Sequence, residues 1–185
     1  MKKQLISAST QLPVHLSEIR DLLKISHQDE DALLVTYCRA AAQACEIFTG
    51  RQLLTQQWQV TLNDWRAREV QIPLSPVQSV DKIEIWNGSI FQLIDATTYL
   101  LDNTSYQARI LPQPAYQWTD PARETGGIKI TVTAGFGDDQ NALPHDLRLG
   151  LLLWISAAYD GGLPGGNQSA ALAEKLWQPY RRMVL

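Results

Sequence analysis

The chain has 185 residues, of which 45% are hydrophobic, and a formal net charge of −3 at pH 7. This length suits one ordinary domain, or a domain that carries an inserted subdomain. The slightly acidic balance argues against a dedicated nucleic-acid binder, which usually has a basic face. No apolar run approaches the ~18 residues of a membrane span, and the start lacks the apolar block of a signal peptide. We therefore expect a protein that is cytoplasmic, or assembled from the cytoplasm, with no membrane partner.

Helical periodicity dominates the first part of the chain, after 14 opening residues that look polar and irregular. A short helix fits residues 17–24, and residues 29–51 have apolar residues at the spacing of one helix face. Ser26 is the expected N-cap of the longer helix, with Asp29 in the third helical position, and Gly50 is its expected C-terminal stop. The apolar face comprises Leu33, Leu34, Tyr37, Cys38, Ala41, Ala44, Cys45 and Phe48.

After Arg51 the period changes from 3.6 to 2, which indicates strands. Alternating apolar residues mark 58–62 and 70–74, and Asn87-Gly88 inside residues 81–94 predicts a hairpin with a type I′ turn. Further strands are expected at 99–102, 109–111 and 128–133. The three prolines and terminal glycines of 112–127 predict a loop.

Helical character returns at Pro144, a favoured first-turn residue. Residues 144–160 are apolar around most of the predicted helix, so this helix is either central to a core or shared with a neighbouring subunit. GGLPGG (161–166) is expected to be a flexible break before a last helix at 169–177. One side of the 144–160 helix carries Leu147, Leu151, Trp154, Ile155 and Ala158, and another carries Leu149, Leu152 and Leu153.

The order of these elements predicts an α+β fold. Segments 1–55 and 139–185 are expected to form a small helical bundle, because the long central helix needs partners for its apolar face. Segment 56–138 is then an inserted antiparallel β subdomain.

The sequence offers no catalytic or cofactor-binding motif. It has no phosphate-binding GxxxxGK[ST], no complete GxGxxG after a strand and no GxSxG nucleophile elbow. His15, His27 and His145 lack the spacing of zinc ligands. Asp138 and Asp139 lie in a Gly-rich turn that is far from an EF-hand pattern. We therefore expect no catalytic residue, no metal site and no cofactor.

The two cysteines, Cys38 and Cys45, are expected to be small buried hydrophobes. Two turns of helix separate them by roughly 10 Å, whereas a disulfide needs Cα atoms within about 7 Å.

Two features suggest recognition surfaces. The first is the set of six tryptophans, in which Trp118 lies in the proline-rich loop and is either an interface anchor or folds back over the β segment. The second is the C-terminus, which is either a frayed end or a tail that orders on a partner. The candidate docking residues of this tail are Trp177, Tyr180, Arg181, Arg182, Met183, Val184 and Leu185. Besides Trp118 and Trp177, the tryptophans are Trp58, Trp65, Trp86 and Trp154.

In their order along the chain, four blocks resemble the head–tail connector, or adaptor, proteins of long-tailed phages and gene transfer agents. The first contains the opening helices and the Thr-Gly-Arg turn, and the second the segment with Pro-Val-Gln-Ser-Val. The third contains Thr-Ala-Gly-Phe-Gly and the Pro-initiated helix, and the last is a short helix that ends in Pro-Tyr-Arg. The first three blocks read LSEIRDLLKISHQDEDALLVTYCRAAAQACEIFTGRQLLTQQW, VQIPLSPVQSVDKIEI and ITVTAGFGDDQNALPHDLRLGLLLWISAAYD.

This resemblance implies a structural virion protein at the capsid–tail junction, assembled in the host bacterial cytoplasm. About twelve copies would form a ring under the portal protein, extend the DNA channel and offer a platform to the next neck or stopper protein. The near-neutral charge suits a channel through which DNA slides without specific binding. Whether the chain is monomeric on its own, or forms its ring only on the portal, stays open at this point.

Two interfaces are expected in such an assembly. The tail from Trp177 to Leu185 is the candidate for portal docking, so deletion of 178–185 is expected to abolish portal binding and to leave the fold intact. The apolar 144–160 helix and the alanine-rich part of the long helix offer surfaces for a heterologous, ring-closing contact. The candidate residues for that contact are Leu149, Leu152, Leu153, Ala40 and Ala44.

Two alternative functions compete with the connector. One is another neck role, a stopper or tail terminator, which we would expect to be mainly β. The other is a small hydrolase or a ligand- or carbohydrate-binding module, with Trp86 and Trp118 as an aromatic platform in a concave pocket.

Overall fold

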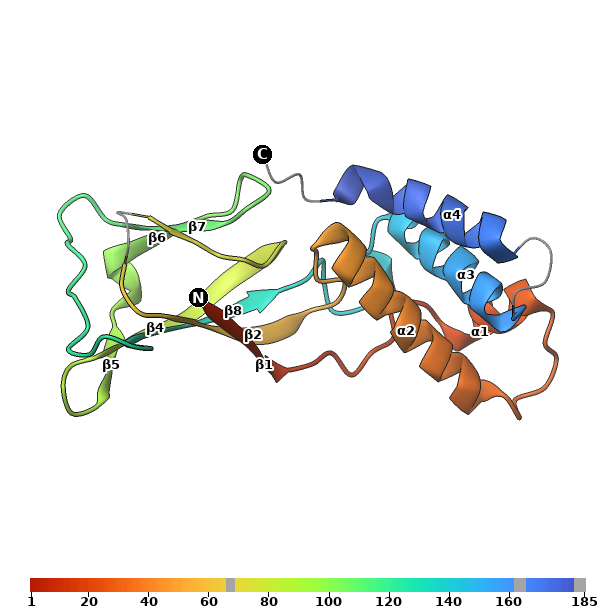
Figure 1. Cartoon of the computed structure of the whole chain (residues 1–185), viewed down its shortest axis with the longest axis horizontal. Coiled ribbons are helices and arrows are strands. Elements are labelled where there is room, and N and C mark those ends of the chain that lie inside the picture. The colour runs from red at the N-terminus through yellow and green to blue at the C-terminus, as the bar shows by residue number, and fades with distance from the viewer. Residues whose placement is uncertain (66–68, 162–165, 182–185) are drawn as a thin grey trace. The chain divides into compact units, whose positions relative to one another are not determined.

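The structure is a computed structural model that describes residues 1–65, 69–161 and 166–181 (Figure 1). The chain divides into two compact units. The sheet unit comprises Met1–Ala8 and Thr55–Gly135, and the helical unit comprises Ser9–Leu54 and Phe136–Leu185. Helices and antiparallel sheets together confirm the predicted α+β class, and the N- and C-terminal helices pack on each other as expected.

The sheet unit consists of two antiparallel sheets that share one hydrophobic core. The first sheet has the strand order β1-β2-β8-β4-β5, and the second has the order β3-β7-β6. The strands are β1 (Lys2–Ser7), β2 (Gln56–Leu62), β3 (Val70–Gln71), β4 (Val77–Trp86), β5 (Phe91–Ile94), β6 (Tyr99–Asp102), β7 (Arg109–Pro112) and β8 (Ile128–Ala134).

Strand β8 is the centre of the larger sheet. Ile130 lies opposite Val60 on one side and opposite Ile83 on the other, and all three side chains are fully buried. The alternation visible in the sequence therefore marks the core face of β2 and β8. Residues 113–127 contain no helix or strand, as expected for that loop.

The predicted hairpin forms between β4 and β5, but its turn is longer than expected. Trp86 pairs with Phe91, so four residues form the connection in place of the two of a type I′ turn. The Asn87 side-chain oxygen accepts hydrogen bonds from the backbone amides of Ser89 and Ile90, both at 3.0 Å. Asparagine thus organises a wider loop through its side chain, which the dipeptide alone does not reveal.

The expectation that the first 14 residues are irregular is wrong for Lys2–Ser7, and so is their assignment to the helical segment. These residues form β1, which pairs with β2 at the edge of the sheet. Every residue of β1 is exposed, so the strand has no buried face and shows no alternation. Pairing with β2, a long-range contact, stabilises it.

The helical unit contains α1 (Leu16–Leu23), α2 (Asp31–Thr49), α3 (His145–Tyr159) and α4 (Gly166–Trp177). Gly50 ends α2 with φ of 71°, the left-handed conformation expected of a glycine stop. Ser26 is not the N-cap, because the helix begins at Asp31 with Glu30 in the cap position and no side-chain cap. Leu33, expected on the core face, is 45% exposed.

The chain leaves and re-enters the helical unit at neighbouring points. The Phe136 amide donates to the Leu53 carbonyl at 3.0 Å, and Leu54 forms a parallel bridge with Gly137. The two ends of the segment between Leu54 and Phe136 therefore lie close together.

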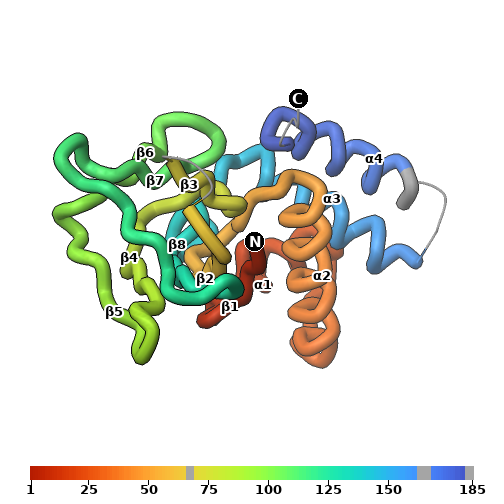
Figure 2. Tube along the Cα trace, turned by 60° about the vertical axis from the view of Figure 1, so that its left-hand side comes forward, coloured from red at the N-terminus to blue at the C-terminus, as the bar shows by residue number. Residues whose placement is uncertain are grey.

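Helices α3 and α4 lie side by side in both views (Figures 1 and 2). Between the two helices, the side chain of Trp177 on α4 lies directly over Gly150 on α3. A Cβ atom added to Gly150 would lie 2.2 Å from the indole nitrogen. Gly150 is therefore required for the close approach of the tryptophan, although it interrupts an otherwise leucine-rich helix.

Candidate assembly surfaces

The C-terminal segment, predicted to dock on a partner, starts inside the helical core. Trp177 is 1% exposed, and its indole N–H donates to the Leu147 carbonyl at 3.3 Å. Its ring centroid lies 6.1 Å from that of Phe48 on α2. The structure thus places Trp177 in the core of the helical unit.

Beyond Trp177, Arg51 holds the chain against the end of α2. Its Nε donates to the Tyr180 carbonyl at 3.0 Å, and its guanidinium lies 6.0 Å from the Tyr180 ring and 5.9 Å from the Phe136 ring. The Arg181 guanidinium lies 5.3 Å from the ring of Phe48. Residues Arg182, Met183, Val184 and Leu185 lie outside the described residues. Sequence reasoning noted the Thr-Gly-Arg turn but not its contact with Tyr180, because 129 positions separate the two.

The apolar outer side of α3 is accessible in part. Leu149 is 49% exposed, whereas Leu152 and Leu153 are half-buried and pack against the core of the helical unit. On α2, Ala40 is exposed and Ala44 is half-buried. The residues proposed for inter-subunit packing are thus at or near the surface of the helical unit.

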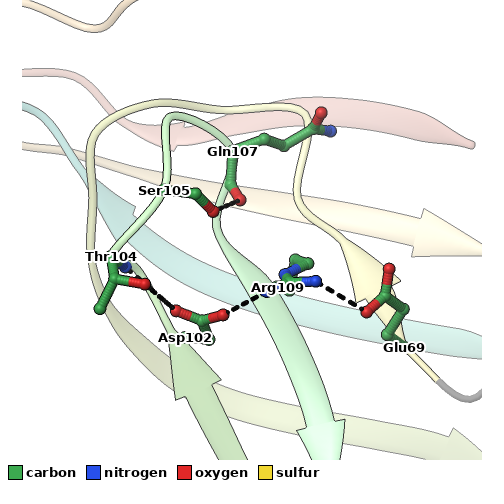
Figure 3. A network of polar contacts seen from close by, with 6 residues as sticks. All are labelled: Glu69, Asp102, Thr104, Ser105, Gln107 and Arg109. Atoms are coloured by element: carbon green, nitrogen blue, oxygen red, sulfur yellow. Dashed lines mark hydrogen bonds and ion pairs between the residues drawn. The ribbon is translucent and has the colours of Figure 1, made fainter.

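The sheet unit contains a charged network around the β6–β7 turn (Figure 3). Arg109 lies between two carboxylates, with its Nη1 3.2 Å from Glu69 and its Nη2 2.6 Å from Asp102. The Thr104 hydroxyl and amide both donate to Asp102, at 2.6 and 3.1 Å. The hydrogen bond from the Thr104 hydroxyl, followed by that from Arg109, lowers the pKa of Asp102 to about 2. The network orders this turn and contains no group placed for catalysis.

Replacement of Asp102 by asparagine is expected to lower the melting temperature at pH 7 and to have a much smaller effect at pH 2. Because the folded-state pKa of Asp102 lies below its ordinary value of 3.8, the carboxylate stabilises the fold above about pH 4. That contribution is lost as the pH falls through 2. Thermal melts at both pH values measure the difference. Asp21→Asn, at an exposed site on α1, is the control; equal shifts at both pH values contradict this prediction.

Trp118 folds back over the sheet unit. Its ring stacks on Trp65, with centroids 4.1 Å apart and planes at 12°, and Tyr116 packs edge-on against it. The Trp65 indole N–H donates to the Thr119 carbonyl at 2.7 Å. The loop 113–127 is therefore anchored by aromatic contacts, and Trp118 is not a free interface anchor.

Trp86 is elsewhere in the sheet unit, with its ring 5.2 Å from Phe91 and 5.0 Å from the Arg123 guanidinium. It lines an open cavity of about 530 Å³ between the β4–β5 hairpin and the loop that contains Tyr116. Trp118 does not line this cavity. The aromatic platform required by the carbohydrate-binding alternative is thus not formed by Trp86 and Trp118.

The cysteines, His15 and Asp139, considered above as possible chemical groups, are buried or contact neighbouring residues. Burial raises the pKa of the Cys38 thiol to about 11 and raises that of Cys45 further, and the two cysteines form no disulfide with each other. The side chain of His15 contacts Gln140, and Asp139 accepts a hydrogen bond from the Asn141 amide at 2.7 Å. Across the described residues, no three His, Cys, Asp or Glu side chains are grouped as metal ligands. Within the same part of the chain, no helix has the length and apolarity to cross a bilayer.

Comparison with known proteins gives one family and several related structures. Residues 13–91 match the sequence profile of the family described as "Phage gp6-like head-tail connector protein". A comparison with curated protein sequences gives no match.

The structural similarity extends over both units. One chain in the neck of an empty gene transfer agent particle, computed with C6 symmetry, has a TM-score of 0.83 and 26% identity. A chain in the virion of a native gene transfer agent particle has a TM-score of 0.82 and 25% identity. A chain in the neck of a native particle, computed with C12 symmetry, has a TM-score of 0.79 and 27% identity. Each comparison covers 100% of this chain and 97% of the other.

Proposed function

We propose that this chain is a head–tail connector and that about twelve copies of it form a ring that joins the capsid to the neck and tail. Its similarity to the phage gp6-like head–tail connector family over residues 13–91, and to chains of gene transfer agent necks, supports this proposal. The similarity to neck chains supports a structural protein of the virion neck, in line with the expectation of a protein without catalysis. The observation that carries the proposal is the structural similarity to neck chains over the full length, including both the sheet unit and the helical unit.

The proposed ring lies under the portal and extends the DNA channel. Its near-neutral subunits, each with a net charge of −3, would grip DNA weakly, because affinity for the phosphate backbone rises with each phosphate that a protein neutralises. Contacts between copies would use the accessible side of α3, with Leu149, Leu152 and Leu153, and the region of Ala40 and Ala44 on α2. A stopper or tail terminator is a less suitable role, because the matching family is that of head–tail connectors.

The segment proposed to bind the portal is the tail that follows Arg181, residues 182–185. Tyr180 and Arg181 are held at the end of α2 by Arg51 and Phe48, so the chain beyond them starts from a defined place on the helical unit. Arg182, Met183, Val184 and Leu185 supply one charge and three apolar side chains for a partner groove. Trp177 does not take part, since it is buried.

Deletion of residues 182–185 is expected to abolish binding to the portal protein encoded in the same genome. The deletion removes none of the described contacts of Trp177, Arg51 or Tyr180, so the melting temperature should stay within about 1–2 °C of the wild type. Co-purification with the portal followed by negative-stain imaging measures the result. The wild type should form a second ring stacked under the portal, and the truncated chain should not.

The longer deletion of 178–185 also removes the Arg51–Tyr180 contact, so comparing the two deletions separates docking from folding. Arg51→Gln is the matched control for that contact, because it retains the tail. If the chain without residues 182–185 still stacks under the portal, the tail is not the docking element. If the wild type stays apart from an assembled portal, the connector role itself is wrong.

A further inference from the structure

We propose that the outer side of α2 is the surface on which the next copy of this chain docks through the Leu149 side of its α3. This inference rests on the proposed ring and names the two surfaces that close it. The α2 surface, hereafter the α2 stripe, consists of Leu33, Thr36, Ala40, Gln43 and Ile47.

The α2 stripe is unusual for an exposed helix side because it carries no charge. All five positions are exposed, and Ile47 and Leu33 have 75% and 45% of their surfaces accessible. Exposed helix positions of a soluble protein normally carry charged or strongly polar residues. The other exposed residues of α2 are Ala32 and Arg39, so Arg39 is the one exposed charge among the residues of this helix.

The spacing of the α2 stripe matches a helix-packing seam. Positions 33, 40 and 47 repeat every seven residues, with 36 and 43 between them, as in the a and d positions of two packed helices. The stripe extends over 15 residues, so its first and last positions lie about 21 Å apart along the helix. Small residues at its centre, Ala40 with Ala44 beside it, allow a neighbouring helix to approach closely.

The complementary surface lies on α3. Leu149 is accessible and is followed by Leu152 and Leu153, three and four residues further on, which places all three on one side of the helix. Each surface has a charge at its margin, Arg39 beside the α2 stripe and Asp146 one turn before Leu149; both are exposed and of opposite sign. Antiparallel or parallel docking of the two leucine-containing surfaces would bury apolar area on both.

The proposed contact pairs two different surfaces of the helical unit. Both helices turn their buried residues, Leu34, Cys38 and Ala41 on α2 and Leu147 and Leu151 on α3, towards one core. Their exposed residues, the α2 stripe and Leu149, therefore belong to two separate helices of the same unit. Repeated head to tail, such a heterologous contact closes into a ring when the rotation between neighbouring copies allows closure, as the proposed ring requires.

Cysteine cross-linking tests the contact in the complete chain bound to the portal. The double variant Ala40→Cys/Leu149→Cys, treated with a short bis-maleimide, should give a ladder of covalent oligomers in which each subunit is linked to the next. The native cysteines leave a low background, because both are buried and burial raises the pKa of each thiol.

Matched controls define the outcome. Each single cysteine variant should give no ladder, and neither should Ala40→Cys/Leu100→Cys, since Leu100 is a similarly exposed leucine, at 51%, on β6. A covalent dimer from Ala40→Cys alone would show a two-fold contact and overturn the inference. If the chain stacks on the portal but gives no ladder, the inference is overturned and the connector function stays in place. If it neither stacks nor gives a ladder, both the connector function and this inference are overturned.

A second variant uses no cross-linker. Ile47→Arg should reduce the number of copies retained on the portal at least tenfold and leave the melting temperature of the isolated chain unchanged, because Ile47 is 75% exposed. Ile90→Arg, in the β4–β5 loop with 63% exposure, is the control and should bind as the wild type does. Equal retention of the two variants contradicts the proposed contact.

Discussion

Replacement of Trp177 by alanine is expected to lower the free energy of unfolding of the helical unit by about 3–5 kcal/mol, the range for removal of a buried large aromatic side chain. Trp177 is 1% exposed and joins α4 to α3 through Leu147 and to α2 through Phe48. Its removal leaves a cavity at the junction of three helices, which the rigid helices cannot close. Urea denaturation followed by circular dichroism at 222 nm measures the loss.

The matched control is Leu172→Ala on the same helix. Leu172 is 48% exposed, so its truncation should change the free energy of unfolding by about 0.5 kcal/mol or less. A similar small change for Trp177→Ala would show that α4 contributes little to the stability of the helical unit. It would also return Trp177 to the set of possible docking residues.

The same contact can be tested from the other side with Gly150→Ala. In the wild type the added Cβ would lie 2.2 Å from Nε1 and 2.7 Å from Cδ1 of Trp177, so the substitution should destabilise the unit by about 1–3 kcal/mol. In the Trp177→Ala background the clash is gone and alanine is the better helix former, by about 1 kcal/mol. The effect of Gly150→Ala should therefore change sign between the two backgrounds, which a double-mutant cycle measures directly.

Replacement of Ile130 by alanine is expected to destabilise the sheet unit by about 2–5 kcal/mol. Ile130 lies on the central strand β8 between Val60 and Ile83, all three fully buried, so the cavity would lie in the middle of the larger sheet. The stacked pair Trp65–Trp118, with centroids 4.1 Å apart, should give an exciton signal in circular dichroism that reports unfolding of this unit alone.

The control for Ile130→Ala is Leu93→Ala on β5. Leu93 is 63% exposed, so its truncation should cost at most about 0.5 kcal/mol. If the two variants unfold at the same urea concentration, the core of the sheet unit is not centred on β8.

Local sequence patterns were reliable where one periodicity controlled the segment. The glycine stop at Gly50, the alternation in β2 and β8 and the apolar outer side of α3 follow from spacing alone. Local patterns failed where a segment is stabilised by a partner that is distant in the sequence or by a side-chain contact. The strand β1 shows no alternation because all its residues are exposed, and the turn after Trp86 is widened by the Asn87 side chain.

The exposed residues of α2 and α3 were predictable only in part, because burial also depends on distant partners. Sequence reasoning selected Ala40 and Leu149 but placed Leu33 in the core, since residues 33 and 34 are both leucines and periodicity cannot tell which of them turns inward. It also placed Trp177 in a docking tail, because nothing local shows that a tryptophan near the end of the chain packs over Gly150.

By itself, the sequence determined the α+β class, the order of helices and strands and the resemblance to head–tail connectors, because these depend on local periodicity and on motifs in a fixed order. The tertiary structure alone decided which apolar residues are buried and which are left exposed. That choice depends on packing between segments far apart in the chain, such as Gly150 beneath Trp177 and Arg51 against Tyr180.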